Sequence, residues 1–284
     1  MPELPEVETL RGDAERCLPG RRIVRVALLA PEVVRAPGPE AFCARLEGAA
    51  FVGARRRGKT LLLDLDTGET LAVQLAVYGQ LLLCEADEPL APETLLVLAL
   101  DDGRELRLLD RSRYARVALA PPADLARQLG LDMLGPEPLE PAFTPEVLAE
   151  RLAGRRARLK ALLLDQHVVA GLGNIYADEA LWRARLHPAR SASSLAPDEV
   201  QRLHDAIQAV LREAIAHRGT TFHTYRDLCG AKGAHQAALA VFHRQGEPCP
   251  RCGTPIQRIT LAGRDTHLCP QCQPAPVGTE AVAR

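Results

Sequence analysis

Four cysteines near the carboxyl end constrain this chain more than any other feature. They form the pairs Cys249–Cys252 and Cys269–Cys272, with sixteen residues between the two pairs. No secretion signal is recognised at the amino end, so we do not expect disulfides. Two CxxC pairs at this spacing fit a tetrahedral Zn²⁺ with four thiolate ligands, holding a small β-hairpin. Because cysteines fill all four positions, we expect one structural zinc ion and no catalytic metal.

The opening MPELPEVETL predicts a helix and, separately, a reactive terminus. Pro5 suits a first helical turn, and Glu6 favours the positive end of the helix dipole. Pro2 and Glu3 are not explained in this way. Removal of the initiator Met would leave Pro2 as a free secondary amine, and an α-amino group has a pKa of about 7.7–8.0. Amines of this kind form Schiff bases, and Glu3 is a neighbouring proton carrier.

Hydrophobic periodicity predicts the organisation of the rest of the chain. Short apolar or alternating runs between residues 22 and 117 predict strands of an antiparallel β-sandwich. The proline-rich GPEPLEP predicts a linker, and the runs that follow it have helical spacing. We therefore expect an α+β multidomain protein with five parts: a catalytic β-sandwich over 1–134, a linker over 135–142, a helical domain over 143–238, a zinc finger over 239–275 and a tail over 276–284.

Charge is distributed unevenly along the chain, although the formal net charge is only −1. Residues 51–60 carry four cations and residues 151–160 carry five, and neither stretch contains an acid. A Gly-x-Gly turn follows the second stretch, and Asn174 then opens a helix whose free N–H groups favour an anion. Together these features favour a phosphate-facing surface. No apolar run approaches the ~20 residues of a membrane span, so we expect a soluble, cytoplasmic protein.

Four separated motifs then carry a resemblance to a known family. MPELPEVETL, the RGK that ends at Lys59, VAGLGNIYADEAL and CPRC…GRDTHLCPQC follow one another between Met1 and about Gln273. In this order they resemble the formamidopyrimidine-DNA glycosylase and endonuclease VIII family, and the opening resembles the formamidopyrimidine-DNA glycosylase branch. The resemblance implies an N-terminal β-sandwich, a helix–two-turn–helix domain and a zinc-bound hairpin. It also implies base excision repair, in which an oxidised base is flipped out and removed and the strand is nicked.

The resemblance implies roles for individual residues. Pro2 is similar to the nucleophile that forms the Schiff base, Glu3 to the proton carrier, and Lys59 to the basic residue assigned to elimination. Arg264 is similar to the arginine that grips the phosphates at the lesion and assists the second elimination. Seven further positions are implied in DNA binding: Val77, Ser112, Arg113, Tyr114, Arg155, Lys160 and Asn174.

The chain departs from the family pattern where the base is selected. Val77, Ser112 and Tyr114 stand at positions where relatives have a methionine, an arginine and a phenylalanine, and His223 stands where arginine is common. Ser112 lacks the guanidinium fork that hydrogen-bonds the base opposite the lesion. We therefore expect intact chemistry with altered substrate selection, including weak discrimination among the opposite bases.

Three functions remain open on this basis. The first is a bifunctional glycosylase and lyase for oxidised purines (8-oxoguanine or formamidopyrimidine), which nicks by β,δ-elimination. The second is an endonuclease VIII-like enzyme for oxidised pyrimidines or abasic sites, and the third is a lesion-binding protein without base excision. The expected partner is double-stranded DNA with a damaged base or an abasic site. We expect no membrane association, a monomer, and a place in the bacterial cytoplasm at the nucleoid.

Overall fold

A computed structural model describes residues 1–276, and its internal contacts divide the chain into two compact units. The first unit comprises Met1–Met133 and Ala214–Gln236, and the second comprises Leu134–Glu213 and the residues from Ala237 onward. Residues 214–236, which the sequence assigned to the helical domain, thus pack within the first unit. The predicted tail, 276–284, lies outside the described residues apart from its first one. Within residues 1–276, none of the helices has the length and apolarity needed to cross a membrane.

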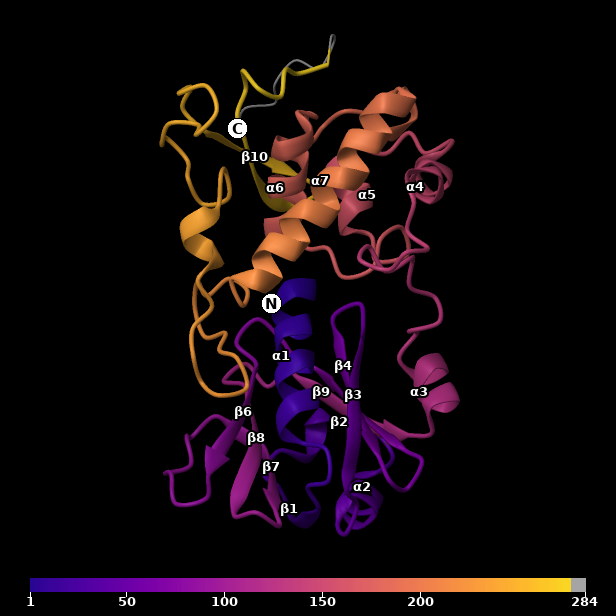
Figure 1. The fold of residues 1–284 in the computed structure, drawn as a ribbon, viewed down its shortest axis with the longest axis vertical. Helices are drawn as coiled ribbons and strands as arrows, with labels where there is room; N and C mark the ends of the chain where they lie inside the picture. Colours follow the sequence, from indigo (N-terminus) through magenta and orange to yellow (C-terminus); the bar gives the residue numbers. More distant parts are fainter. Residues whose placement is uncertain (277–284) are drawn as a thin grey trace. The chain divides into compact units, whose positions relative to one another are not determined.

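The first unit is built from two sheets, with the strand orders β1-β7-β8-β6 and β2-β9-β5-β4-β3 (Figure 1). Neighbouring strands are antiparallel as predicted, except that β2 pairs with β9 in parallel. The strands are β1 (Ile23–Leu28), β2 (Val34–Ala36), β3 (Phe51–Arg57), β4 (Thr60–Leu65), β5 (Thr70–Gln74), β6 (Gln80–Glu85), β7 (Thr94–Leu100), β8 (Arg104–Leu109) and β9 (Arg116–Ala120). The helical elements are α1 (Leu4–Cys17), η1 (Pro31–Val33), α2 (Pro39–Leu46) and α3 (Pro122–Gln128).

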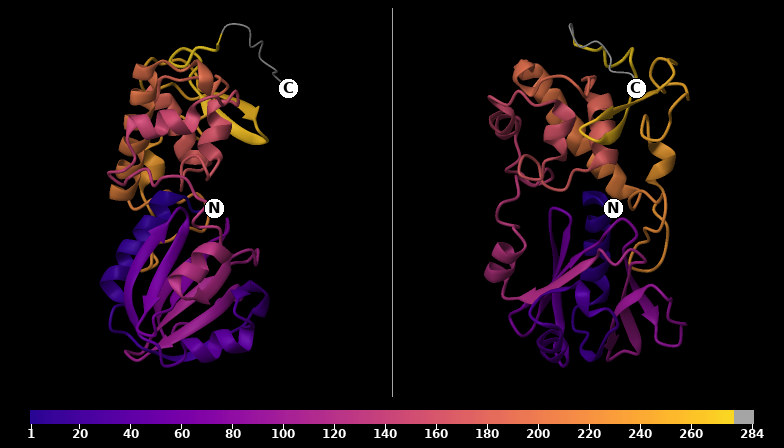
Figure 2. Two further views of the ribbon diagram at one scale, coloured as in Figure 1. Left: turned by 90° about the vertical axis from the view of Figure 1, so that its right-hand side faces the viewer. Right: turned by 180° about the vertical axis from the view of Figure 1, so that it is seen from behind.

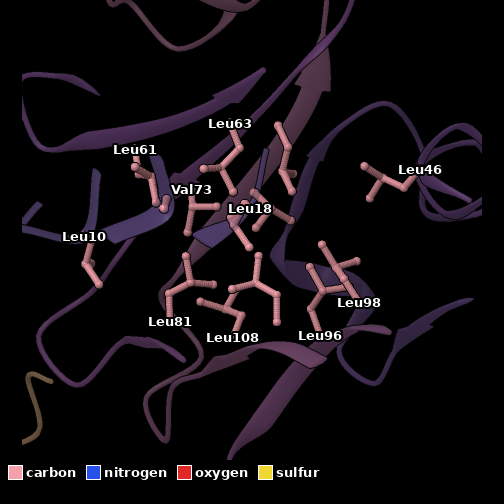
Figure 3. Packing of buried hydrophobic residues seen from close by; sticks show 14 of the residues in the cluster. Leu10, Leu18, Leu46, Leu61, Leu63, Val73, Leu81, Leu96, Leu98 and Leu108 are labelled. Carbon is pink, nitrogen blue, oxygen red and sulfur yellow. The ribbon is translucent and has the colours of Figure 1, made fainter. Parts of the chain in front are cut away.

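The core of this unit lies between the sheets and under α1. Val73 and Leu63 from one sheet and Leu98 and Leu108 from the other point toward a common centre (Figure 3). Leu10 joins them from the buried face of α1. Burying a leucine side chain contributes about 1.5–3 kcal/mol, so this cluster fixes how the sheets and the helix pack.

Two acidic side chains fix the direction of α1 along the sheet. Glu8 pairs with Arg56 at 3.0 Å, and Glu15 accepts a hydrogen bond of 2.6 Å from the backbone N–H of Ala54. The helix therefore runs antiparallel to β3, and its amino end lies at the β3–β4 turn (Figures 1 and 2).

The second unit consists of helices and a two-stranded hairpin. Its elements are α4 (Pro145–Leu152), α5 (Leu159–Leu164), α6 (Asn174–Ala184), η2 (Ala192–Ser194), α7 (Pro197–Ala216, whose last three residues belong to the first unit), η3 (His235–Ala238, divided between the units), β10 (Gln257–Leu261) and β11 (Arg264–Leu268). Residues 144–165, which follow the linker and have helical spacing, do not form one continuous helix. Gly154, at φ +68°, follows the end of α4, and the chain after it pairs with residues 191–193 before α5 begins.

Candidate active site and metal centre

Three connections lie together at one end of the five-stranded sheet. Thr60 pairs with Gln74, and Gln74 pairs with Arg116, so the β3–β4 turn (58–59), the loop 75–79 and the loop 110–115 are neighbours. The Gln74 side chain also donates a hydrogen bond of 3.0 Å to the Thr60 hydroxyl. The amino end of α1 lies at this end as well (Figure 1). We call this region the loop end, and it brings together all the predicted site residues of the first unit: Pro2, Glu3, Lys59, Val77, Ser112, Arg113 and Tyr114.

The amino terminus is held tightly at the loop end. Pro2 and Glu3 are buried, whereas Met1 is 57% exposed. The backbone N–H of Glu3 donates to the Glu6 carboxylate at 2.8 Å, and this carboxylate also accepts a 2.8 Å hydrogen bond from the N–H of Thr220. While Met1 is attached, the Pro2 nitrogen is an amide nitrogen. This nitrogen becomes a free secondary amine only if the exposed Met1 is removed.

Lys59 is presented by a two-residue hairpin turn. Arg57 and Thr60 form the last pair of the ladder, and Gly58 adopts φ +55°. A positive φ at the first central position alone is typical of a type II′ turn, which matches the twist of the flanking strands. Lys59 is half-buried at the second position. This geometry explains why the motif needs glycine immediately before the lysine.

A buried carboxylate shapes the loop 110–115. Asp110 accepts hydrogen bonds of 2.6–2.9 Å from the Ser112 N–H and hydroxyl and from the N–H groups of Tyr114 and Ala115. Asp110 itself is fully buried. The Tyr114 side chain is left 74% exposed, and Val77 in the adjoining loop is 49% exposed. Two large, mainly apolar side chains at the loop end are thus exposed.

A segment far along the chain is anchored on α1. We call residues 218–235 the docking segment. Arg218 lies 2.6 Å from both Asp13 and Asp227, and the Tyr225 hydroxyl donates to the Glu6 carbonyl oxygen at 3.3 Å. His223, within this segment, has its ring 6.2 Å from that of Tyr78. No local sequence pattern predicts these anchors, because Asp13 and Arg218 are 205 positions apart.

The four predicted zinc ligands lie together in the second unit. Their sulfur atoms all lie within 4.8 Å of one another, and three sulfur pairs are separated by 3.4, 3.5 and 3.9 Å. A tetrahedron with Zn–S bonds of about 2.3 Å has sulfur atoms about 3.8 Å apart, so the set fits Zn²⁺. The indole N–H of Trp182 in α6 donates to Cys249 Sγ at 3.4 Å. The Arg251 guanidinium lies 4.2 Å above the Trp182 ring, which ties the finger to α6.

Arg264 begins β11 directly after a tight turn. Ala262 and Gly263 have φ of +51° and +69°, as a type I′ hairpin turn requires, and Arg264 is exposed. Helix α6 supports this hairpin. The Asn174 side-chain amide donates to the Asp265 carbonyl oxygen at 3.0 Å. Asn174 opens α6 as predicted, but its amide N–H is used within the protein.

Lys160 differs most from its predicted role. Its side chain is fully buried and forms an ion pair with Asp178, which is also fully buried. Asp178 accepts a 2.9 Å hydrogen bond from the His267 N–H as well, so one carboxylate connects α5, α6 and β11. This enclosed position does not support the predicted phosphate contact. Arg155, by contrast, is exposed, and its nearest carboxylate is Asp165 at 3.8 Å.

Glu179 is a further buried carboxylate of α6 that sequence reasoning did not single out. It accepts hydrogen bonds of 2.8–2.9 Å from the N–H groups of Ala240, Val241 and Phe242. Burial raises the pKa of Glu179, and the three backbone donors oppose that rise. The carboxylate holds the segment 240–242, which leads into the zinc finger.

The fold and these two sets of residues define a DNA glycosylase built from three recognised parts. Residues 1–117 match the formamidopyrimidine-DNA glycosylase N-terminal domain. Residues 134–226 match the formamidopyrimidine-DNA glycosylase H2TH domain, and residues 246–275 match the zinc finger found in FPG and IleRS.

Whole-chain similarities agree with these matches. The formamidopyrimidine-DNA glycosylase of Symbiobacterium thermophilum is 52% identical, over 98% of this chain and 91% of its own. That of Herpetosiphon aurantiacus is 48% identical, over 96% and 100%. A Lactococcus lactis FPG mutant bound to Fapy-dG-containing DNA superposes with a TM-score of 0.91 at 34% identity, covering 96% of this chain and 100% of that one. The L. lactis Fpg bound to abasic-site DNA gives a TM-score of 0.90 at 34% identity and the same coverage. The chain belongs to the formamidopyrimidine-DNA glycosylase family, as its motifs predicted.

Proposed function

We propose that this protein is a base excision repair glycosylase and AP lyase that removes oxidised purines from double-stranded DNA through an N-terminal proline. The observation that carries the proposal is the gathering of Pro2, Glu3 and Lys59 at the loop end, beside exposed apolar side chains that suit a base gap. Membership of the family supports the glycosylase activity itself. We also propose that the protein is a monomer and acts on nucleoid DNA in the bacterial cytoplasm.

The chemistry begins once Met1 has been removed. The Pro2 nitrogen attacks C1′ of the damaged nucleotide and the C1′–base bond breaks; the base leaves with the bonding electron pair and takes up the proton that the Pro2 nitrogen loses. Glu3 delivers a proton to the ring oxygen, so the deoxyribose opens and an iminium forms between Pro2 and C1′. The iminium acidifies C2′, and loss of a C2′ proton expels the 3′ phosphate. A second elimination expels the 5′ phosphate, with Lys59 and Arg264 stabilising the charge on the leaving phosphates.

Zinc supplies no step in this chemistry. When bound, it holds the finger that carries Arg264, because a module of this size gains its folding free energy from thiolate–metal bonds. The exposed Arg155 and Arg264 are proposed phosphate contacts of the second unit, and Asn174 is retained as a weaker candidate. Phosphate contacts fix the position and orientation of a protein on the duplex but do not depend on the base sequence. An enzyme that acts on damage in any sequence requires contacts of this kind.

Borohydride trapping tests the nucleophile. With abasic-site DNA, borohydride should reduce the iminium and yield a covalent adduct at Pro2. Pro2→Gly should weaken trapping, and a protein that retains Met1 should not be trapped. Undiminished trapping of the Met1-retaining protein would move the Schiff base to a lysine and contradict the assignment.

A panel of duplexes tests the substrate class. The lesions are 8-oxoguanine, formamidopyrimidine, thymine glycol and an abasic site. Fastest excision of the two purine lesions supports the proposal. Fastest cutting of thymine glycol or the abasic site favours the endonuclease VIII-like alternative. Binding without incision indicates a lesion-binding protein.

A further inference from the structure

Arg111 holds an unusual position at the loop end. Its guanidinium carbon lies 3.7 Å from the centre of the Tyr78 ring, so the side chain is stacked across from one loop to the other. Arg111 is exposed, and no carboxylate of residues 1–276 is paired with it. A guanidinium stacked on an aromatic face is attracted by the ring quadrupole and keeps its N–H groups in plane and available.

Ser112 and Arg113 of the same loop already have partners within the protein. The Ser112 hydroxyl donates to Asp110 at 2.6 Å, and Arg113 pairs with Glu32 at 3.1 Å. Arg113 also has φ +57°, a left-handed backbone conformation that is uncommon for residues other than glycine. Of the two arginines in this loop, Arg111 is therefore the one whose guanidinium has no carboxylate partner among residues 1–276.

The neighbours of Arg111 define what such a ligand would meet. Val77 precedes Tyr78 in one loop, and Tyr114 follows three positions after Arg111 in the other. Both are exposed apolar side chains suited to fill the gap left by a flipped base. Arg111, stacked on Tyr78, thus belongs to the same two loops as both wedges, where a guanidinium can reach a base that has lost its partner.

We propose that Arg111, stacked on Tyr78, reads the base opposite the lesion in place of the arginine missing at Ser112. This inference rests on the proposed function. A guanidinium carries only donors, so it favours an edge with two adjacent acceptors. Cytosine offers N3 and O2, thymine and guanine place an N–H in the middle of that edge, and adenine pairs one acceptor with a donor. The protein therefore prefers cytosine opposite the lesion, which replaces the weak discrimination expected from Ser112 alone.

The test compares incision of one lesion placed opposite C, T, G and A. The wild type should cut the C duplex fastest. Arg111→Ala should lower the ratio of kcat/KM for C over A by about 5- to 150-fold, the range equivalent to about 1–3 kcal/mol for a bidentate base contact. Arg111→Lys, which keeps the charge but loses the fork, should also lose most of the preference. Because each ratio comes from one protein preparation, a partly folded variant does not distort it.

Two further variants test the stacking, and one controls for charge. Tyr78→Phe keeps the aromatic face and should keep the ratio, whereas Tyr78→Leu should lower it. Arg25→Ala removes another exposed arginine, which lies on β1 and pairs with Glu105 at 3.8 Å, and should leave the ratio unchanged. A preference for C that survives Arg111→Ala overturns the inference, as does a wild type that cuts all four duplexes equally. A wild type that cuts none of them contradicts the proposed function, and the inference falls with it.

Discussion

Replacing Lys160 tests whether this residue stabilises the fold or contacts a DNA phosphate. In the structure the Lys160 ammonium and the Asp178 carboxylate are both fully buried, and they form an ion pair. Lys160→Met removes the cation with little change in volume and leaves an uncompensated buried carboxylate. Breaking one partner of a buried pair costs about 3–5 kcal/mol. Each kcal/mol lowers Tm by about 2–4 °C for a domain of this size, so we expect a fall of roughly 10 °C.

The double variant Lys160→Met/Asp178→Asn controls for the buried charge. It removes both charges, and the asparagine oxygen still accepts the hydrogen bond that Asp178 receives from the His267 N–H at 2.9 Å. Replacing a whole buried pair is often close to neutral, so most of the lost stability should return. Thermal unfolding followed by circular dichroism measures all three proteins.

DNA binding over a range of salt concentrations completes the assay. A lysine that neutralises one phosphate contributes about 0.9 to the slope of log K against log salt. We expect Lys160→Met, measured well below its Tm, to keep the wild-type slope. An unchanged Tm together with a slope reduced by about 0.9 would refute the structural role and restore the predicted phosphate contact.

Three further predictions concern the metal, a pH-dependent ion pair and the docking segment. Cys249→Ser or strong chelation should unfold the zinc finger and abolish lesion-DNA binding while the β-sheet signal of the first unit persists; normal binding by metal-free protein would contradict this. Hydrogen bonds from Arg190 lower the pKa of Glu199, so its contribution is present above about pH 4.3 and is lost as the pH falls further. Glu199→Gln should therefore lower stability at pH 7 by less than about 1 kcal/mol, seen as a small fall in Tm, and the difference from wild type should shrink as the pH is lowered below about 4.3. Gly233→Ala would place a Cβ 2.2 Å from the Gly219 carbonyl oxygen, so it should cost about 1–3 kcal/mol and expose the docking segment to proteolysis.

Local pattern was enough to predict most of the strands and the metal site. The short apolar runs in KTLLLDL and LAVQLAV predicted β4 and β5, and both strands are buried along almost their whole length. The four cysteines were predicted from spacing alone, because both pairs lie on tight turns of one short module. The helix α2 was missed. It is eight residues long and buries only Phe42 and Leu46, too few to establish a helical period.

Long-range contacts were beyond sequence reasoning. The run over 144–165 has helical spacing throughout, but Gly154 and the pairing of residues 155–158 with 191–193 interrupt it. Lys160 ends a basic stretch that is typical of a protein surface. Its burial depends on pairing with Asp178, which lies eighteen positions away. A motif predicts the local backbone around a residue, whereas the surroundings of its side chain depend on partners that are distant in the sequence.

The acidic residues of α1 show how one helix holds the proposed nucleophile in place. A helix dipole accounts for Glu6 and Glu8 in the first turns, but not for Asp13 and Glu15 near the carboxyl end, where a negative charge is unfavourable. All four have specific partners: Glu8 and Glu15 bind β3, whereas Glu6 and Asp13 bind the docking segment. Sliding α1 by one residue would rotate it by about 100° and break all four contacts at once. Pro2 sits two residues before this helix, so its position at the loop end is fixed by contacts that extend along most of α1.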